Sequence, residues 1–261
     1  MAAFSLGAKA RAAGYRLAGY DSIGSTNTEA LRAATAGDPG GIWFCALQQT
    51  EGRGRRGRPW ASAPGNLAAT LLLVPEADPG IAATLGFVAG VALNQALAGM
   101  LPGARTIALK WPNDVLADGA KLAGILLEAH KLDDGRHAVA IGFGVNIVAA
   151  PKALPYPAVS LADLGSALDA AAVFEALGDF WVDCFALWRD GLGIGEVLTL
   201  WRQMAAGIGA PVAVSQNGAV VRGIFETIDD SGRLIVRADN DERVAITAGD
   251  VHFGGTASVA G

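Results

Sequence analysis

The stretch GRGRRGR, residues 52–58, alternates glycine with arginine, and the fold assignment of this 261-residue sequence starts from it. Arginine side chains are planar, permanently charged groups that bind phosphate or carboxylate through paired hydrogen bonds. The glycines allow the backbone to fold closely around a ligand. Four like charges this close repel each other, which predicts a loop whose order depends on a bound anion. Taken alone, the stretch fits an anion-binding loop and a solvated basic surface loop about equally well.

The same letters match the G-x-G-x-x-G fingerprint of dinucleotide-binding folds. That fingerprint turns from a strand directly into a helix. Here PWASAPG follows at residues 59–65, and its two prolines and glycine do not continue as a helix. The context therefore argues against a dinucleotide-binding fold.

Further polar residues follow apolar segments later in the chain. KWPND, at 110–114, places a lysine, an amide and a carboxylate at the end of a predicted strand. Asn113 and Asp114 could hold Mg²⁺ together with phosphates, although a simple turn is the more common explanation of such a pair. Lys121 opens an apolar strand and can either point its ammonium group into a pocket or extend to the surface. Asn146 ends the run IGFGVN, where a structural turn is an equally good explanation.

Hydrophobic periodicity predicts a chain of mixed helices and strands. Thr26 and Glu29 have the spacing of a capping box, which predicts a helix that stops at Gly37. Strands are predicted at 42–49, 67–74 and 107–111, a hairpin from 121–129 and 138–148, and helices at 81–100 and within 170–206. From residue 211 onward, short strands alternate with turn signals at Asn217-Gly218 and at 230–232, which is typical of a small antiparallel barrel.

Composition limits the classes of protein to which the chain can belong. Hydrophobic residues make up 52% and charged residues 17%, which favours a well-filled core over disorder. The net charge of −5 disfavours a general nucleic-acid binder. Cys45 and Cys184 lie in apolar segments and are predicted to be buried thiols. The sequence shows neither a signal peptide nor a long uninterrupted apolar stretch, so a cytoplasmic protein with no membrane contact is predicted.

Five motifs in order carry a resemblance to a known family. They are STN at 25–27, QTEGRGRRGRPW at 49–60, KWPNDV at 110–115, KLAGILLE at 121–128 and IGFGVNI at 141–147. In this order they resemble the biotin–protein ligases (biotin–[acetyl-CoA-carboxylase] ligases), densely over 20–148 and more loosely over 211–254. The resemblance implies an α+β fold with a mixed sheet flanked by helices, of the class II synthetase-like biotin/lipoate ligase type. It assigns residues 1–207 to the catalytic domain and residues 208–261 to a small C-terminal SH3-like β-barrel.

The resemblance also implies a reaction and a set of site residues. Biotin reacts with ATP, assisted by Mg²⁺, to give biotinyl-5′-AMP, and biotin is then transferred to a lysine of a biotin carboxyl carrier domain. The implied catalytic residues are Lys121, Arg55 and Arg53. The implied biotin-binding residues are Ser25, Thr26, Asn27, Gln49, Arg53, Arg55, Arg56, Gly124, Leu126 and Gly142. The implied ATP-binding residues are Arg55, Arg56, Arg58, Trp60, Asn113, Lys121 and Asn146, and the candidate Mg²⁺ ligands are Asn113 and Asp114.

Two alternatives and several partner questions stay open at this point. A lipoate–protein ligase runs similar chemistry on a related fold. A non-catalytic anion- or RNA-binding protein would use the arginine loop but would leave Lys121, Asn113 and Asp114 unexplained. The segment before Ser25 is too short for the helix-turn-helix module of repressor relatives, so no sequence-specific DNA binding is predicted. The sequence does not indicate whether the chain is a monomer or a homodimer, which carboxylase is the acceptor, or what residues 150–207 do.

Overall fold

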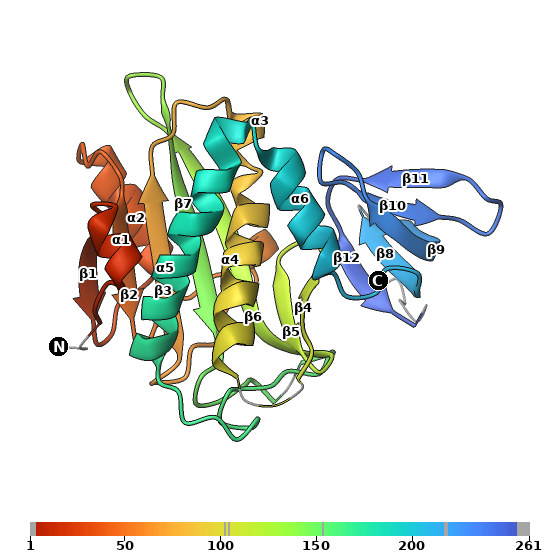
Figure 1. Cartoon of the computed structure of the whole chain (residues 1–261), viewed down its shortest axis with the longest axis horizontal. Coiled ribbons are helices and arrows are strands. Elements are labelled where there is room, and N and C mark those ends of the chain that lie inside the picture. Colours follow the sequence, from red (N-terminus) through yellow and green to blue (C-terminus); the bar gives the residue numbers. More distant parts are fainter. Residues whose placement is uncertain (1–3, 102, 104, 153, 217–218, 255–261) are drawn as a thin grey trace.

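Two long helices lie side by side on one face of a seven-stranded sheet (Figure 1). They are α4 (Leu85–Met100) and α5 (Ala170–Trp188). This computed structural model describes residues 4–101, 103, 105–152, 154–216 and 219–254. The short helix α1 (Ala8–Ala12) precedes the first strand, and the short helix α3 (Pro79–Ala82) precedes α4.

The large sheet has the order β1-β2-β3-β7-β6-β5-β4. Its strands β1 and β2 are parallel, and every other neighbouring pair is antiparallel, so the sheet is mixed. The strands are β1 (Arg16–Tyr20), β2 (Ile42–Ala46), β3 (Leu67–Leu73), β4 (Ile107–Lys110), β5 (Asp114–Ala117), β6 (Ala120–Lys131) and β7 (His137–Val145).

Side-chain alternation along the strands gives the sheet two different faces. On one face, residues such as Trp43, Leu71 and Ile141 join the main core with α4 and α5. On the other face, Phe44 and Leu72 pack against helix α2 (Thr26–Thr35) in a smaller apolar cluster. The α2 side therefore has a thin apolar layer, which leaves part of this face available for a cavity.

The start of α2 differs from the predicted capping box by one residue. The N-cap is Ser25, whose Oγ accepts a hydrogen bond from the Thr28 amide, and Thr26 is the first helical residue. Glu29 pairs with Arg32 and does not reach back to the cap. The prediction placed the cap at Thr26, and it was wrong because the side chain of Gln49 already binds both the amide and the hydroxyl of Thr26.

The segment Pro79–Met100, which contains α3 and α4, is long and apolar enough to cross a membrane by length and composition, with a mean hydropathy of 1.6. Within its most apolar window, 61% of residues are buried inside the protein. This burial is the pattern of a core helix, in agreement with the predicted helix that packs against a sheet.

The C-terminal part forms a separate five-stranded antiparallel sheet of order β11-β10-β9-β8-β12. Helix α6 (Ile194–Gln203) lies between it and the rest of the molecule (Figure 1). The strands are β8 (Pro211–Gln216), β9 (Ala219–Ile228), β10 (Leu234–Arg237), β11 (Arg243–Ile246) and β12 (Asp250–Phe253). The predicted turn residues Asn217 and Gly218 lie outside the described residues, but Gln216 and Ala219 on either side of them pair with each other.

The two sheets share one continuous core, which includes Val212 and Phe225 of the second sheet. Trp111 Nε1 donates a hydrogen bond of 3.0 Å to the carbonyl of Gly232, and this ties the end of β4 to the β9–β10 turn. The predicted α+β fold, with a mixed sheet, flanking helices and a small C-terminal β module, is confirmed. The domain boundary between residues 207 and 208 stays a prediction.

Candidate active site

One cavity of about 770 Å³ brings together residues from both sheets. Its size is within the range of small-molecule binding sites. Of the predicted site residues, those that line it are Ser25, Thr26, Asn27, Gln49, Arg53, Arg55, Arg56, Arg58, Trp60, Asn113, Asp114, Lys121, Gly124, Leu126 and Gly142. Only Asn146 is not among the lining residues. The C-terminal sheet contributes Gly249 and Asp250 to the wall.

At one end of the cavity, the first turn of α2 presents a buried polar group. Thr26 and Asn27 are 2% and 5% exposed. Gln49 Oε1 accepts hydrogen bonds from the Thr26 amide (2.7 Å) and the Thr26 hydroxyl (3.0 Å). These bonds join the start of α2 to the segment that follows β2, so this polar group is pre-organised.

Thr70, in the middle of β3, also contacts Thr26 and Asn27, and it was not predicted as a site residue. Its Oγ1 is fully buried and lies 2.6 Å from Asn27 Oδ1 and 2.8 Å from Thr26 Oγ1. Asn27 Nδ2 donates to Glu128 Oε2 at 2.8 Å. The carboxamide of Asn27 is therefore fixed at both ends. Thr70 has no motif in the sequence, because a buried threonine in an apolar strand is ordinary.

The cavity floor is glycine-rich backbone of β6 and β7. Gly124 is paired with Gly144, and Leu126 with Gly142. A Cβ atom on Gly142 would lie 2.3 Å from Asn27 Oδ1, and one on Gly144 would lie 2.5 Å from the Trp60 ring. The missing side chains therefore let Asn27 and Trp60 lie directly on the sheet.

Lys121 points its ammonium group into the cavity, between a carboxylate and two aromatic rings. Its Nζ lies 2.7 Å from Asp114 Oδ1, as an ion pair whose angles do not meet hydrogen-bond geometry. The centroids of the Trp60 and Tyr156 rings are each 5.5 Å from Nζ, within cation–π range. Tyr156 was not predicted, since it lies within residues 150–207, to which the sequence assigned no role.

The arginine loop closes on itself as a short hairpin. The Gly54 amide donates to the Arg58 carbonyl (2.7 Å), and the Trp60 amide donates to the Gly52 carbonyl (2.9 Å). Within it, Arg55–Gly57 forms one 3₁₀ turn, and Arg56 has a left-handed backbone with φ 56°. This turn directs the arginine side chains to different parts of the wall.

Each arginine of the loop has a partner elsewhere in the chain. Arg53 pairs with Glu128 at 3.2 Å, and Arg56 and Arg58 both pair with Asp250. Arg55 Nη1 donates to Asn113 Oδ1 at 3.2 Å, and burial lowers the pKa of its guanidinium. The carboxylates of Glu128 and Asp250 therefore offset the repulsion between the arginines. This repulsion was the reason to expect a loop whose order depends on a bound anion. Glu128 and Asp250 were not predicted, because their contacts with the loop are distant in sequence.

Asn146 is 1% exposed and lies outside the cavity lining. Its Nδ2 donates to the carbonyls of Val159 (3.2 Å) and Lys121 (3.4 Å). These bonds support the backbone that carries Lys121. A direct contact between Asn146 and a nucleotide stays a prediction, and the geometry favours a supporting role.

The candidate metal ligands already have protein partners. Asn113 Oδ1 accepts from Arg55, and Asp114 pairs with Lys121. Among the described residues, no group of three or more His, Cys, Asp or Glu side chains could hold a metal. The donor set fits Mg²⁺ only in the form in which phosphates supply most of its ligands and Asp114 supplies a carboxylate oxygen.

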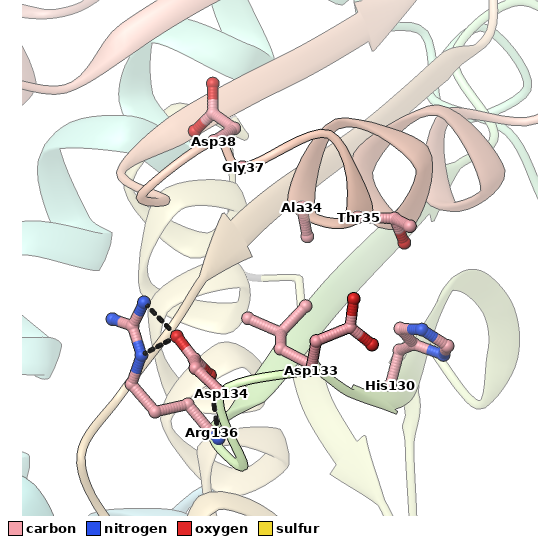
Figure 2. A pocket seen from close by; sticks show the side chains of 9 residues that line it. Ala34, Thr35, Gly37, Asp38, His130, Asp133, Asp134 and Arg136 are labelled. Atoms are coloured by element: carbon pink, nitrogen blue, oxygen red, sulfur yellow. Dashed lines mark hydrogen bonds and ion pairs between the residues drawn. The ribbon is translucent and has the colours of Figure 1, made fainter.

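A second, smaller cavity of about 210 Å³ lies beyond the end of α2, against the β6–β7 turn (Figure 2). Asp38, His130, Asp133 and Arg136 are among its lining residues. Arg136 Nε donates to Asp134 Oδ2 at 2.8 Å, and this bond closes the turn. None of the predicted site residues lines this cavity, and its Asp38 carboxylate is paired with Arg16.

Comparison with known families agrees with the geometry of the larger cavity. Residues 21–146 match the biotin/lipoate A/B protein ligase family, and residues 207–254 match the biotin protein ligase C terminal domain. A biotin protein ligase from Aquifex aeolicus in complex with biotin and ATP has the same fold. Its TM-score is 0.73 at 22% identity, over 91% of this chain and 98% of that chain.

Curated relatives of higher identity extend over most of the chain. The biotin–[acetyl-CoA-carboxylase] ligase of Paracoccus denitrificans is 43% identical over 240 residues, which cover 88% of this chain and 98% of that protein. The enzyme of the same name from Mycobacterium tuberculosis is 37% identical over 87% of this chain and 85% of its own length. The bifunctional ligase/repressor BirA of Bacillus subtilis is 32% identical, and 77% of its length is covered. With two family domains in order and relatives similar over most of their lengths, the chain belongs to the biotin protein ligase family.

Proposed function

We propose that this chain performs biotin–[acetyl-CoA-carboxylase] ligase activity in the cavity between its two sheets. The activity itself follows from the relatives and the family match. In the first step, a biotin carboxylate oxygen attacks the α-phosphorus of ATP and pyrophosphate leaves. In the second step, a lysine amine of a biotin carboxyl carrier domain attacks the acyl carbon and AMP leaves. The observation that carries this proposal is the meeting of Lys121, the arginine loop and the polar start of α2 in one cavity.

The polar start of α2 is the proposed site for the ureido ring of biotin. Ser25, Thr26, Asn27 and Gln49 offer hydroxyl and amide groups to a neutral ring that has donors and an acceptor. The bonds from Gln49 and Thr70 hold these groups before any ligand arrives. A site pre-organised in this way discriminates against ligands that lack the matching polar groups. Leu126, Gly124 and Gly142 would form the floor beneath the ring system.

The cations of the cavity are the proposed catalysts of adenylate formation. Two anions, a carboxylate and a triphosphate, must approach each other, and charge builds up around the α-phosphorus in the transition state. Lys121 is the proposed bridge between biotin carboxylate and α-phosphate, and Arg53 and Arg55 are its proposed partners. Fixed cations in a partly dry site stabilise such charge without reorganising, so they lower the barrier.

The nucleotide would lie toward the C-terminal sheet. Arg55, Arg56 and Arg58 are the proposed phosphate ligands, and Trp60 and Asn113 would contact the nucleoside or its phosphates. Mg²⁺, with Asp114 and Asn113 as its proposed protein ligands, would supply charge neutralisation to the phosphates. Asp114 also pairs with Lys121 and so holds the lysine in the cavity.

The alternatives left open by the sequence lose support at this point. Both curated relatives of highest identity quoted above are named biotin ligases, which favours biotin over lipoate. A non-catalytic anion- or RNA-binding protein would not need the buried polar network around Asn27. The absence of sequence-specific DNA binding and a cytoplasmic location stay predictions, and monomer or homodimer is undecided. A gel shift at low salt and analytical ultracentrifugation are the respective tests of DNA binding and assembly.

Mass spectrometry of an acceptor domain tests the proposed reaction directly. A biotin carboxyl carrier domain is incubated with enzyme, ATP, Mg²⁺ and biotin, and its acceptor lysine should gain one biotinyl group. Parallel reactions replace biotin by lipoate, omit ATP, or use a carrier whose acceptor lysine is arginine, and these should leave the carrier mass unchanged. An unmodified carrier in the complete reaction, or equal modification with lipoate, would contradict the proposal.

A further inference from the structure

Asp250, the first residue of β12, faces the arginine loop from the C-terminal sheet. Its Oδ2 lies 2.6 Å from Arg58 Nη2 and 3.1 Å from Arg56 Nη1. The neighbouring carbonyl of Gly249 accepts from Arg55 Nη1 at 3.4 Å. Two consecutive residues of the second sheet thus contact three arginines of a loop that belongs to the first part of the chain.

The surroundings of Asp250 strengthen this contact. Its side chain is only 24% exposed, so solvent screens the attraction less than on an open surface. Burial by itself raises the pKa of a carboxyl group. At Asp250 the hydrogen bond from Arg58 and the charges of Arg58, Arg56 and Arg55 outweigh burial and lower the pKa, so the carboxylate is ionised at neutral pH.

The backbone that carries Asp250 is closely packed. A Cβ atom on Gly249 would lie 2.6 Å from Val214 Cγ1, so only glycine allows this peptide to lie against β8. Val251, the next residue, is 4% exposed and belongs to the core. The carboxylate therefore projects from a closely packed edge strand, whereas the main-chain hydrogen bonds that close the loop, Gly54 to Arg58 and Trp60 to Gly52, are within the loop and its flank.

We propose that Asp250 is a positioning residue that latches the arginine loop, residues 52–58, across the cavity and so slows the escape of bound biotinyl-AMP. Among the described residues, Asp250 is the carboxylate partner of both Arg56 and Arg58. The identity of the retained ligand rests on the proposed function, but the latch contact does not. The opposite role for an internal anion, competition with a ligand phosphate for the arginines, predicts the opposite change in retention.

Asp250→Asn removes the charge and keeps the shape of the side chain. Asp230→Asn is the matched control, because Asp230 forms another ion pair across the same two parts of the chain, with Arg202 at 2.8 Å, but does not line the cavity. Asp250→Glu keeps the charge and should behave more like the unaltered protein than Asp250→Asn does. Far-ultraviolet circular dichroism establishes that all three variants are folded.

The first readout is limited trypsin digestion, since the loop itself contains three arginine cleavage sites, after Arg53, Arg55 and Arg56, while Pro59 blocks cleavage after Arg58. Cleavage after Arg53, Arg55 and Arg56, followed by mass spectrometry, should be about fivefold faster in Asp250→Asn, which corresponds to roughly 1 kcal/mol for a partly exposed ion pair. Asp230→Asn should leave the rate at these sites unchanged. Equal rates in the unaltered protein and Asp250→Asn would overturn the latch, whether or not the chain makes biotinyl-AMP.

The second readout is dissociation of biotinyl-AMP, measured by chasing the labelled adenylate with excess unlabelled biotin and ATP. Asp250→Asn should release it about fivefold faster than the unaltered protein and Asp230→Asn. Slower release would overturn the latch and support competition with the phosphate, and unchanged release would overturn its effect on retention. Failure of the unaltered protein to form any adenylate would instead count against the proposed function, with the trypsin result still deciding the latch contact.

Discussion

Lys121 combines a charged partner, two aromatic neighbours and a position in the cavity wall. Replacing it by alanine removes one pre-organised cation from the site of charge development. We expect Lys121→Ala to slow adenylate formation by about 10²–10³-fold, equivalent to roughly 3–4 kcal/mol. Single-turnover release of pyrophosphate measures this step. Lys131→Ala, at the exposed far end of the same strand, is the control and should leave the rate unchanged. A Lys121→Ala rate within a few-fold of normal would remove Lys121 from catalysis.

A second prediction at the residue scale concerns Gly142, whose role depends on the absence of a side chain and not on charge. A Cβ atom there would lie 2.3 Å from Asn27 Oδ1 and would force that side chain away from Thr70 and Glu128. Loss of one well-made hydrogen bond to biotin corresponds to about tenfold in affinity, so Gly142→Ala should weaken biotin binding by at least that factor. Isothermal titration calorimetry measures the affinity. Gly86→Ala, whose Cβ would make an ordinary 3.6 Å contact with Leu127, should bind biotin normally. Normal affinity in Gly142→Ala would argue against Asn27 as a biotin ligand.

Among elements, those with a clear periodicity were predictable from sequence. Strands β3 and β7 and helix α4 are apolar segments of sufficient length, and the structure has them where they were predicted. Strand β5 (Asp114–Ala117) was missed, because it has four residues and its order depends on pairing with β4 and β6. Strand β1 was missed for a similar reason, since it is an edge strand that relies on β2 alone.

The same distinction separates the predicted site residues from the missed ones. Residues inside compact motifs, such as the arginine loop, could be named from sequence because their residue types and spacing are unusual. Asp250 and Thr70 could not, because each is ordinary in its own segment and gains its role from a distant partner. Arg58 and Asp250 are 192 residues apart. The placement of Asn146 outside the cavity lining shows the converse, since a motif residue can support the site from behind.

The chain just beyond the end of β7 depends on one buried side chain from a distant segment. Asn66, 2% exposed just before β3, accepts hydrogen bonds at Oδ1 from the amides of Ile147 and Val148, both 2.9 Å. Asn66→Ala leaves these amides without that partner, so the free energy of unfolding should fall by about 2–3 kcal/mol. Urea denaturation measures the loss. Asn240→Ala, which removes a hydrogen bond to the Glu242 amide in an exposed turn, should change stability by less than about 0.5 kcal/mol. Equal effects of the two substitutions would show that this end of the strand is held otherwise.

At the scale of the whole molecule, the two sheets act as one unit. One continuous apolar core includes Trp43 of the large sheet and Val236 of the C-terminal sheet. The wall of the cavity likewise contains residues from both sheets. The contact between Trp111 and Gly232 adds a buried hydrogen bond at this junction. Stability and the shape of the site are therefore coupled, and a change that loosens the core in one part should be detected in the unfolding of the entire chain.

The buried thiol of Cys184 should make the free energy of unfolding depend on pH in the alkaline range. Burial, assisted by the charge of Asp183, raises the pKa of Cys184 from 9.0 to about 12. Below pH 9 the thiol is protonated in both the folded and the unfolded chain, so its contribution is fully present. Between pH 9 and about 12 the unfolded chain loses the proton while the folded chain keeps it, and stability is lost as pH rises. The expected loss at pH 10 is about 1.4 kcal/mol for this thiol.

Urea unfolding under reducing conditions, at a series of pH values between about 8 and 10, measures that slope. Cys184→Ala should lower stability at every pH, because it leaves a small cavity, but it should also flatten the decline above pH 9. The difference between the two curves isolates the thiol, since the other titrating groups, Tyr15 and Lys110 among them, are common to both proteins. Parallel curves would mean that Cys184 ionises as readily in the folded protein as in the unfolded chain, which its 2% exposure makes physically unfavourable.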